Sequence, residues 1–177
     1  LNLARIHQRT NSDELVPILG SLYAWEPFFW DQLRLGQLIP LLVMPIKHPL
    51  ANLLVQSEIS YFTCLLPFFL VPRYLQRGPY WIVTGAAVTL LHLLAASQEY
   101  LWMYWFPAQA YGPALTLALW GLIVLEDFPG IRQAPGRFAA AAFLILLAHW
   151  EIGTTAVLIA PFLLLRYLCR QMPFREC

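Results

Sequence analysis

Two adjacent carboxylates near the start of the chain, Asp13 and Glu14, have the residue types and spacing best suited to chemistry. They follow Asn11 and Ser12, either of which can cap a helix that begins near Asp13. In one interpretation the pair occupies the first turn of that helix, where the helix dipole favours negative charge. In the other, the pair lies at a membrane surface, and one carboxylate acts as a general base or binds a divalent metal. The predicted apolar face of this helix contains Leu15, Ile18, Leu19 and Leu22.

Two aromatic blocks carry the other candidate residues. The first, residues 25–36, contains Asp31 and Arg34, which either pair on a helix or line a pocket in which Arg34 faces a phosphate. The second opens with Glu99 and contains Trp102. Aromatic side chains gather at the headgroup level of a membrane. Beside carboxylates they also form platforms for sugars, so both blocks are candidate substrate-binding segments.

The composition excludes several classes of protein for a chain of 177 residues. Hydrophobic residues make up 59% and charged residues 12%, and the mean hydropathy is +0.59. An ordinary soluble domain has about 45–50% apolar and about 25% charged residues. So little charge argues against a soluble enzyme or a disordered segment. The net charge of +1 argues against a nucleic-acid partner. These values predict an integral membrane protein whose partner is the lipid bilayer.

Apolar windows predict an all-α fold, a polytopic helical bundle with about five transmembrane helices. A helix needs about 20 apolar residues to cross a bilayer, with a range of roughly 17–25. The last two windows are split by a very short polar joint and predict a tight helical hairpin. The five windows are Leu50–Pro72, Pro79–Gln98, Tyr111–Leu125, Phe138–Trp150 and Ile152–Leu168.

A sixth apolar stretch, Leu33–Ile46, is short and contains two prolines. It is either a short tilted span or a helix that lies in the membrane interface. We therefore divide the chain into residues 1–48, a non-cytoplasmic loop with amphipathic or juxtamembrane helices, and residues 49–177, the transmembrane bundle.

The charged residues sort by side when the five windows alternate in direction. Basic residues mark the cytoplasmic side, and seven of the eleven fall at alternate joints, namely Arg73, Arg77, Arg132, Arg137, Arg166, Arg170 and Arg175. The opposite, non-cytoplasmic side receives most of the acidic residues, namely Asp13, Glu14, Glu26, Asp31, Glu99 and Glu151. Because acidic residues contribute little to membrane orientation, their clustering is an independent sign of a functional surface.

The order of these features resembles the N-terminal half of the GT-C superfamily, the polytopic glycosyltransferases that use polyprenyl-phosphate-linked sugars. That family carries a Ser-Asp-Asp/Glu-Leu stretch, matched here by residues 12–15. A second family stretch, similar to Trp-Gly-Gln-x-Arg-Phe-Gly, is matched by Trp30-Asp31-Gln32-Leu33-Arg34-Leu35-Gly36 with departures at two positions. The chain begins with Leu1, and the resemblance implies a preceding span and a further C-terminal part outside it.

The resemblance implies an inverting glycosyltransferase in the bacterial inner (plasma) membrane, with a lipid-linked sugar donor as partner. Asp13 and Glu14 would be the acidic catalytic motif in a first external loop, and one of them would deprotonate the acceptor hydroxyl. Arg34, Asp31, Glu99 and Trp102 would bind substrate. Some members also bind a divalent cation, so a cation is one candidate cofactor for this chain.

Two other functions fit the residues. Glu58, His92 and the pair His149 and Glu151 lie within or beside predicted spans, where ionisable groups are costly and mark functional sites. A secondary transporter would use Glu58 and His92 as a proton or substrate relay. A non-catalytic membrane scaffold would use the aromatic blocks only as anchors.

Overall fold

The computed structural model describes residues 12–27, 36–75, 78–97, 110–126 and 130–171. Within these ranges every regular element is a helix and there is no strand, which confirms the all-α class. The side chains of residues 12–16, 158 and 166–171 lie outside the description. The helices are α2 (Ser12–Leu22), α3 (Leu38–Val43), α4 (Pro49–Leu65), α5 (Pro67–Leu75), α6 (Trp81–Ala95), α8 (Tyr111–Val124), α9 (Pro135–Glu151) and α10 (Thr155–Gln171).

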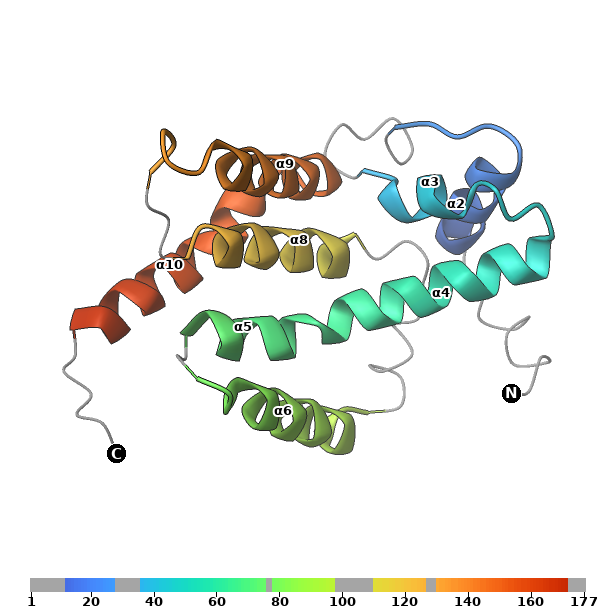
Figure 1. Cartoon of the computed structure of the whole chain (residues 1–177). Coiled ribbons are helices and arrows are strands. Elements are labelled where there is room, and N and C mark those ends of the chain that lie inside the picture. The colour runs from blue at the N-terminus through green and yellow to red at the C-terminus, as the bar shows by residue number, and fades with distance from the viewer. Residues whose placement is uncertain (1–11, 28–35, 76–77, 98–109, 127–129, 172–177) are drawn as a thin grey trace.

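Helix α8 is the centre of the bundle (Figure 1). It packs most extensively against α9, and it also contacts α4, α5 and α10. Helix α6 packs against α5 at the edge of the molecule. Helices α2 and α3 contact each other and α4, and they lie over the N-terminal half of α4, beyond the end of α8 (Figure 1). The bundle therefore has an α2–α3 end and an opposite end where α5 and α8 finish and α9 begins.

Small residues allow the backbone of α8 to approach its neighbours closely. A Cβ atom added at Gly112 would lie 2.9 Å from the backbone nitrogen of Cys64 in α4. One added at Gly121 would lie 3.2 Å from the carbonyl oxygen of Ala141 in α9. The Thr116 hydroxyl also donates a hydrogen bond to the carbonyl oxygen of Thr63 at 2.7 Å. Small residues and interhelical hydrogen bonds are what hold helices together in lipid.

Helices occur at all five predicted windows, but in the part of the chain that the structure describes only one is long and apolar enough to cross a membrane. It is the nearly continuous pair α4 and α5, Pro49–Leu75. Helices α6 and α8 and the first part of α10 are apolar but shorter, and their lengths do not confirm the predicted number of spans. Residues 152–154 connect α9 to α10, which confirms the short joint of the predicted hairpin.

The spanning alternative for Leu33–Ile46 is wrong. Of its described residues, 36–46, only Leu38–Val43 are helical, a length of about 9 Å at 1.5 Å per residue. Gly36 and Gln37 precede the helix because the Gly36 N–H donates to the carbonyl oxygen of Glu151 at 2.9 Å. Helix α3 instead lies against α4, with Ile39, Pro40 and Val43 buried.

Glycines and prolines form the joints, as the sequence predicts. Gly78 and Gly130 have φ angles of +113° and +119°, a backbone conformation that residues other than glycine rarely adopt. Pro49 and Pro135 occupy the first turns of α4 and α9, where the missing N–H costs nothing. The short joints therefore follow from local backbone preferences.

The close contact at Gly112 gives a direct test of the packing of α8. In Gly112→Ala, the new methyl group meets the Cys64 backbone, and overpacking of this kind costs about 1–3 kcal/mol. Thermal unfolding in detergent should therefore show a lower Tm than the parent chain. The matched control is Gly136→Ala in the first turn of α9, where nothing lies within 4 Å of the added atom. An equal or higher Tm for Gly112→Ala would contradict the close packing.

Candidate functional site

The structure describes the backbone of two of the six predicted site residues. Asp13 and Glu14 lie in the first turn of α2, which begins at Ser12, so the predicted helix start is confirmed. The other four lie outside the described residues, Asp31 and Arg34 in segment 28–35 and Glu99 and Trp102 in segment 98–109. We therefore describe the residues that follow these two segments, Gly36 and Ala110, and their contacts.

The predicted apolar face of α2 is only partly correct. Ile18 is buried, but Leu19 is half exposed, and Pro17 and Ser21 are fully buried beside Ile18. The inward face contains a serine because α2 packs against a polar strip of α4, and the Ser21 hydroxyl has partners there.

A buried network of amide and hydroxyl groups joins α2, α3 and α4. The Ser21 hydroxyl lies 2.8 Å from Asn52 Oδ1, to which it can donate. Gln56 Nε2 donates to the same Asn52 oxygen at 2.7 Å and lies 3.1 Å from Ser21 Oγ. Asn52 Nδ2 donates to the carbonyl oxygens of Val43 and Ile46, at 3.2 and 2.9 Å. The end of α3 and the helix that carries Asp13 and Glu14 are thereby fixed to α4.

A buried carboxyl group, Glu151, fixes the other end of α3. Its Oε2 atom accepts a hydrogen bond from the Leu38 N–H, at the first turn of α3, at 3.1 Å. Its carbonyl oxygen accepts one from the Gly36 N–H at 2.9 Å. A Cβ atom at Gly36 would lie 2.7 Å from Glu151 Oε2 and 2.8 Å from the carbonyl oxygen of Trp150. Only glycine fits this contact, which explains the last residue of the Trp30–Gly36 motif.

Burial raises the pKa of the Glu151 carboxyl from 4.5 to about 7, although the hydrogen bond from Leu38 opposes part of the shift. The side chain is 2% exposed, so desolvation penalises its charged form. A carboxyl group with a pKa near 7 can hold or release a proton at physiological pH. Strongly shifted buried carboxyls of this kind concentrate at functional sites.

Two tryptophans and a glutamine lie at the same contact between α3 and the end of α9. The rings of Trp25 and Trp150 pack edge to face, with centroids 6.3 Å apart. Trp25 Nε1 donates to the carbonyl oxygen of Gln37 at 3.1 Å. The side-chain oxygen of Gln37 is buried and has no hydrogen-bond partner in the part of the chain that the structure describes. Ligand pockets are lined by aromatic and apolar side chains with a few placed polar groups, and this set contains both kinds.

The two undescribed segments are followed along the chain by residues that meet at the α9–α10 joint. Gly36 follows segment 28–35 and pairs with Glu151. Ala110 follows segment 98–109 and forms one buried apolar cluster with Ala114 and Ile152. The first described residue after each segment, Gly36 or Ala110, therefore contacts one of two consecutive residues, Glu151 or Ile152.

Sequence reasoning assigned Glu151 and the first aromatic block to one side of the membrane, but it did not single out Gln37 and Trp150 or the pairing of Gly36 with Glu151. The sequence shows the Trp30–Gly36 motif, which continues into Gln37, and the short joint around Glu151 and Gly153. What it could not supply was the partner of Gly36, which is distant in the sequence.

The ionisable residues of the transporter hypothesis do not form a cluster in the described residues. Glu58 is exposed on α4, on a different face from the buried Asn52 and Gln56. The His92 ring packs against Phe68, with ring centroids 4.7 Å apart. Among the described residues, no group of three His, Cys, Asp or Glu side chains could hold a metal ion.

No protein-family model, curated protein or solved structure matches this chain.

The raised pKa of Glu151 predicts a pH-dependent stability. Between about 4.5 and about 7 the unfolded chain loses this proton while the folded chain keeps it. The free energy of unfolding therefore falls as pH rises through this window and is level above it, a loss on the order of 3 kcal/mol. In Glu151→Gln the amide oxygen still accepts from Leu38 but carries no charge. The Tm of the variant relative to the parent chain should rise from about pH 5 to about pH 8.

Glu58→Gln on the exposed face of α4 is the matched control for removing one carboxyl group. Parallel Tm curves for Glu151→Gln and the parent chain over this pH range would contradict the titration of Glu151.

Proposed function

We propose that the chain is part of a multi-pass membrane glycosyltransferase that transfers a sugar from a polyprenyl-phosphate donor on the non-cytoplasmic face. The observation that carries the proposal is the junction at Glu151. There Gly36 and Ala110, the residues that follow the two aromatic, acidic segments, lie against Glu151 and Ile152, and α3 packs against α2, which has Asp13 and Glu14 in its first turn. Two tryptophans and a buried carboxyl group thus lie at one end of an apolar bundle, and α2 joins them to the carboxylate pair along the chain.

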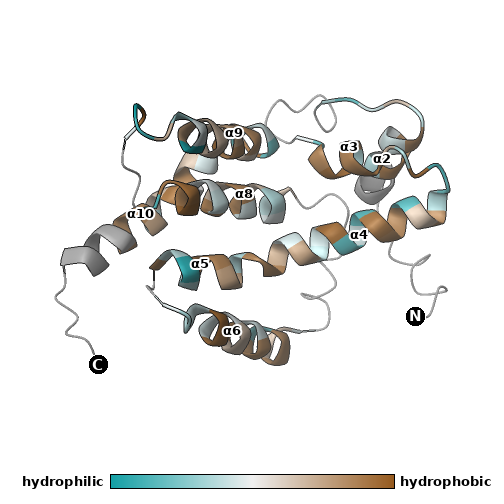
Figure 2. Cartoon of the chain, viewed as in Figure 1, coloured by the Kyte–Doolittle hydropathy of each residue, from teal (hydrophilic) through white to brown (hydrophobic). Residues whose placement is uncertain are grey.

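The distribution of polar and apolar surface supports a membrane location. Asn52, Gln56 and Ser60 are fully buried on α4, whereas Leu54 and Phe62 of the same helix are 45% and 59% exposed. Only 17% of the apolar window in Pro49–Leu75 is buried, unlike the core helix of a soluble protein. Large apolar side chains are also exposed along α6, α9 and α10, and Figure 2 shows the brown ribbons of these helices. In water such exposure favours aggregation, whereas lipid accommodates it.

The two ends of the bundle support the proposed orientation. Arg73, Glu126 and Arg137 gather where α5 and α8 end and α9 begins. Glu151 lies at the other end of α9, about 21 Å from Arg137 at 1.5 Å per residue. By the positive-inside rule, the arginine end faces the cytoplasm and the Glu151 end faces away from it.

The proposed reaction is an inverting displacement. One carboxylate of Asp13 and Glu14 takes the proton of the acceptor hydroxyl as its oxygen attacks the anomeric carbon. The bond from that carbon to the phosphate oxygen breaks, and the polyprenyl phosphate leaves with the electron pair. Arg34 pairs with the phosphate, and the aromatic residues hold the sugar. Glu151 acts as a positioning residue, because it fixes the backbone that follows Arg34.

The activity test uses the full chain in liposomes with a polyprenyl-phosphate sugar and a glycan acceptor. Loss of the general base should lower the transfer rate of the Asp13→Asn, Glu14→Gln double variant by about 10²–10⁴-fold. The matched control is Glu58→Gln, which should retain activity. Full transfer by the double variant would contradict the role of the pair, and loss of proton-coupled uptake in Glu58→Gln would instead favour a transporter.

The orientation can be tested by cysteine labelling. Lys47 and Arg132 are exposed, near the α2–α3 end and in the joint before α9, respectively. With Cys64, Cys169 and Cys177 replaced by alanine, Lys47→Cys should react with a membrane-impermeant maleimide added outside spheroplasts. Arg132→Cys should react only after the membrane is opened. Labelling of both positions from the same side would contradict the proposed topology.

A further inference from the structure

A pocket of about 510 Å³ opens at the arginine end of the bundle, remote from the proposed catalytic end. It lies where α5, α6, α8 and α9 meet, and Arg73, Arg137, Glu126 and Trp81 line it. The Gly78-Pro79 turn and Ile123 complete its wall. Its volume falls within the range of about 300–1,000 Å³ that is typical of small-molecule sites.

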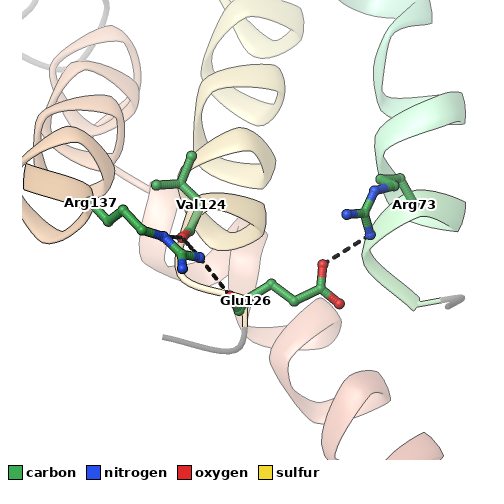
Figure 3. Close-up of polar contacts among 4 residues, drawn as sticks. All are labelled: Arg73, Val124, Glu126 and Arg137. Atoms are coloured by element: carbon green, nitrogen blue, oxygen red, sulfur yellow. Dashed lines mark hydrogen bonds and ion pairs between the residues drawn. The ribbon is translucent and has the colours of Figure 1, made fainter. Parts of the chain in front are cut away.

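The two guanidinium groups of this pocket are held in place by the protein. Arg73 Nη1 forms an ion pair with Glu126 Oε2 at 3.0 Å (Figure 3). Arg137 Nη2 donates to the carbonyl oxygens of Val124 and Glu126, at 2.8 and 2.7 Å, and thereby caps the end of α8. These contacts orient both side chains and use only part of the five N–H donors that each guanidinium carries.

The charge of the pocket favours an anion. Among the described residues that line it, Arg73 and Arg137 contribute two positive charges and Glu126 one negative charge, a net charge of +1. The Glu126 side chain is 10% exposed, whereas that of Arg73 is 38% exposed, so an incoming group meets the guanidinium first. Arginine binds phosphate through paired, charge-assisted hydrogen bonds, and a tryptophan beside it suits the interface between lipid and water.

The surface beside the pocket is apolar. Tyr80, Ile82 and Val83, which flank Trp81, are 76%, 52% and 68% exposed. This surface belongs to the first turn of α6 and continues along that helix. A free phosphate ion would gain nothing from it, whereas acyl chains attached to the phosphate would cover it.

We propose that this pocket binds the headgroup of an anionic phospholipid of the cytoplasmic leaflet, with the phosphate between Arg73 and Arg137 and the acyl chains along α6. Basic pockets between membrane helices on the cytoplasmic side are suited to such headgroups. The inference rests on the proposed membrane orientation but not on sugar transfer, since the pocket lies at the end opposite to Asp13 and Glu14.

The test titrates the full chain in neutral detergent and follows bound ligand by native mass spectrometry. The three probes are dioctanoyl phosphatidylglycerol, dioctanoyl phosphatidylcholine and inorganic phosphate. Phosphatidylglycerol should bind at least about tenfold more tightly than either of the others, because only it has both a net negative charge and acyl chains. Arg137→Gln should weaken this binding about tenfold, because it removes a charge-assisted contact.

Three variants separate ligand binding from a purely structural role. Glu126→Gln removes the opposing negative charge and releases Arg73, so it should strengthen phosphatidylglycerol binding roughly fivefold. A residue that only supports the fold would weaken it. Arg73→Gln combined with Glu126→Gln removes the ion pair without leaving a buried unpaired charge, and it should abolish this gain. Arg132→Gln, an exposed arginine outside the pocket, controls for charge and should change the affinity less than twofold.

Three outcomes would overturn the proposal. Equal weakening by Arg132→Gln and Arg137→Gln would indicate diffuse charge attraction. Weaker binding in Glu126→Gln would indicate a structural network only. Inorganic phosphate that binds as tightly as phosphatidylglycerol would indicate a site for free phosphate. None of these outcomes depends on the transfer assay, so this inference and the proposed function can fail separately.

Discussion

The contact between Glu151 and the backbone of residues 36–38 determines how the two parts of the chain meet. It joins groups 113 residues apart, the end of α9 and the first turn of α3. The carboxyl group satisfies an N–H at a helix start that has no partner within the helix. Because the group is buried, it also carries a desolvation cost, which appears as its raised pKa. It acts together with the Trp25–Trp150 ring contact, which also joins the N-terminal part of the chain to the end of α9.

The bundle relies on backbone proximity and buried hydrogen bonds more than on buried large side chains. Ala114, Ala118 and Leu119 of α8 are fully buried, and the contacts at Gly112 and Gly121 leave no room for a methyl group. Asn52, Gln56 and Ser21 exchange hydrogen bonds within the same apolar surroundings. Such an interior remains stable when the outer surface is apolar, because neither packing nor hydrogen bonding depends on exclusion of water.

The two ends of the bundle differ in chemistry. One end contains the Glu151 carboxyl group, whose pKa is raised, together with Trp25, Trp150 and the buried amide of Gln37. Helix α2, which carries the carboxylate pair in its first turn, packs against α3 at this end. At the other end, two arginines and one glutamate line an open pocket. The proposed enzyme would use the first end for the sugar and the second to hold the surrounding lipid.

The sequence by itself determined the helical class, the start of α2, the places of the later helices and the short joint between α9 and α10. Each of these follows from local rules, namely capping near Ser12, apolar windows and turns at Gly78 and Gly130. The spacing of Arg137 and Glu151 along one apolar window also predicted that they lie at opposite ends of a helix, which α9 confirms. The sequence could not determine the length of α3 or the inward face of α2, and it predicted a longer helix and a purely apolar face. Tertiary structure decided both, since Gly36 pairs with Glu151 and Ser21 faces Asn52. A pairing between distant residues leaves no periodic trace along the chain, and only folding reveals it.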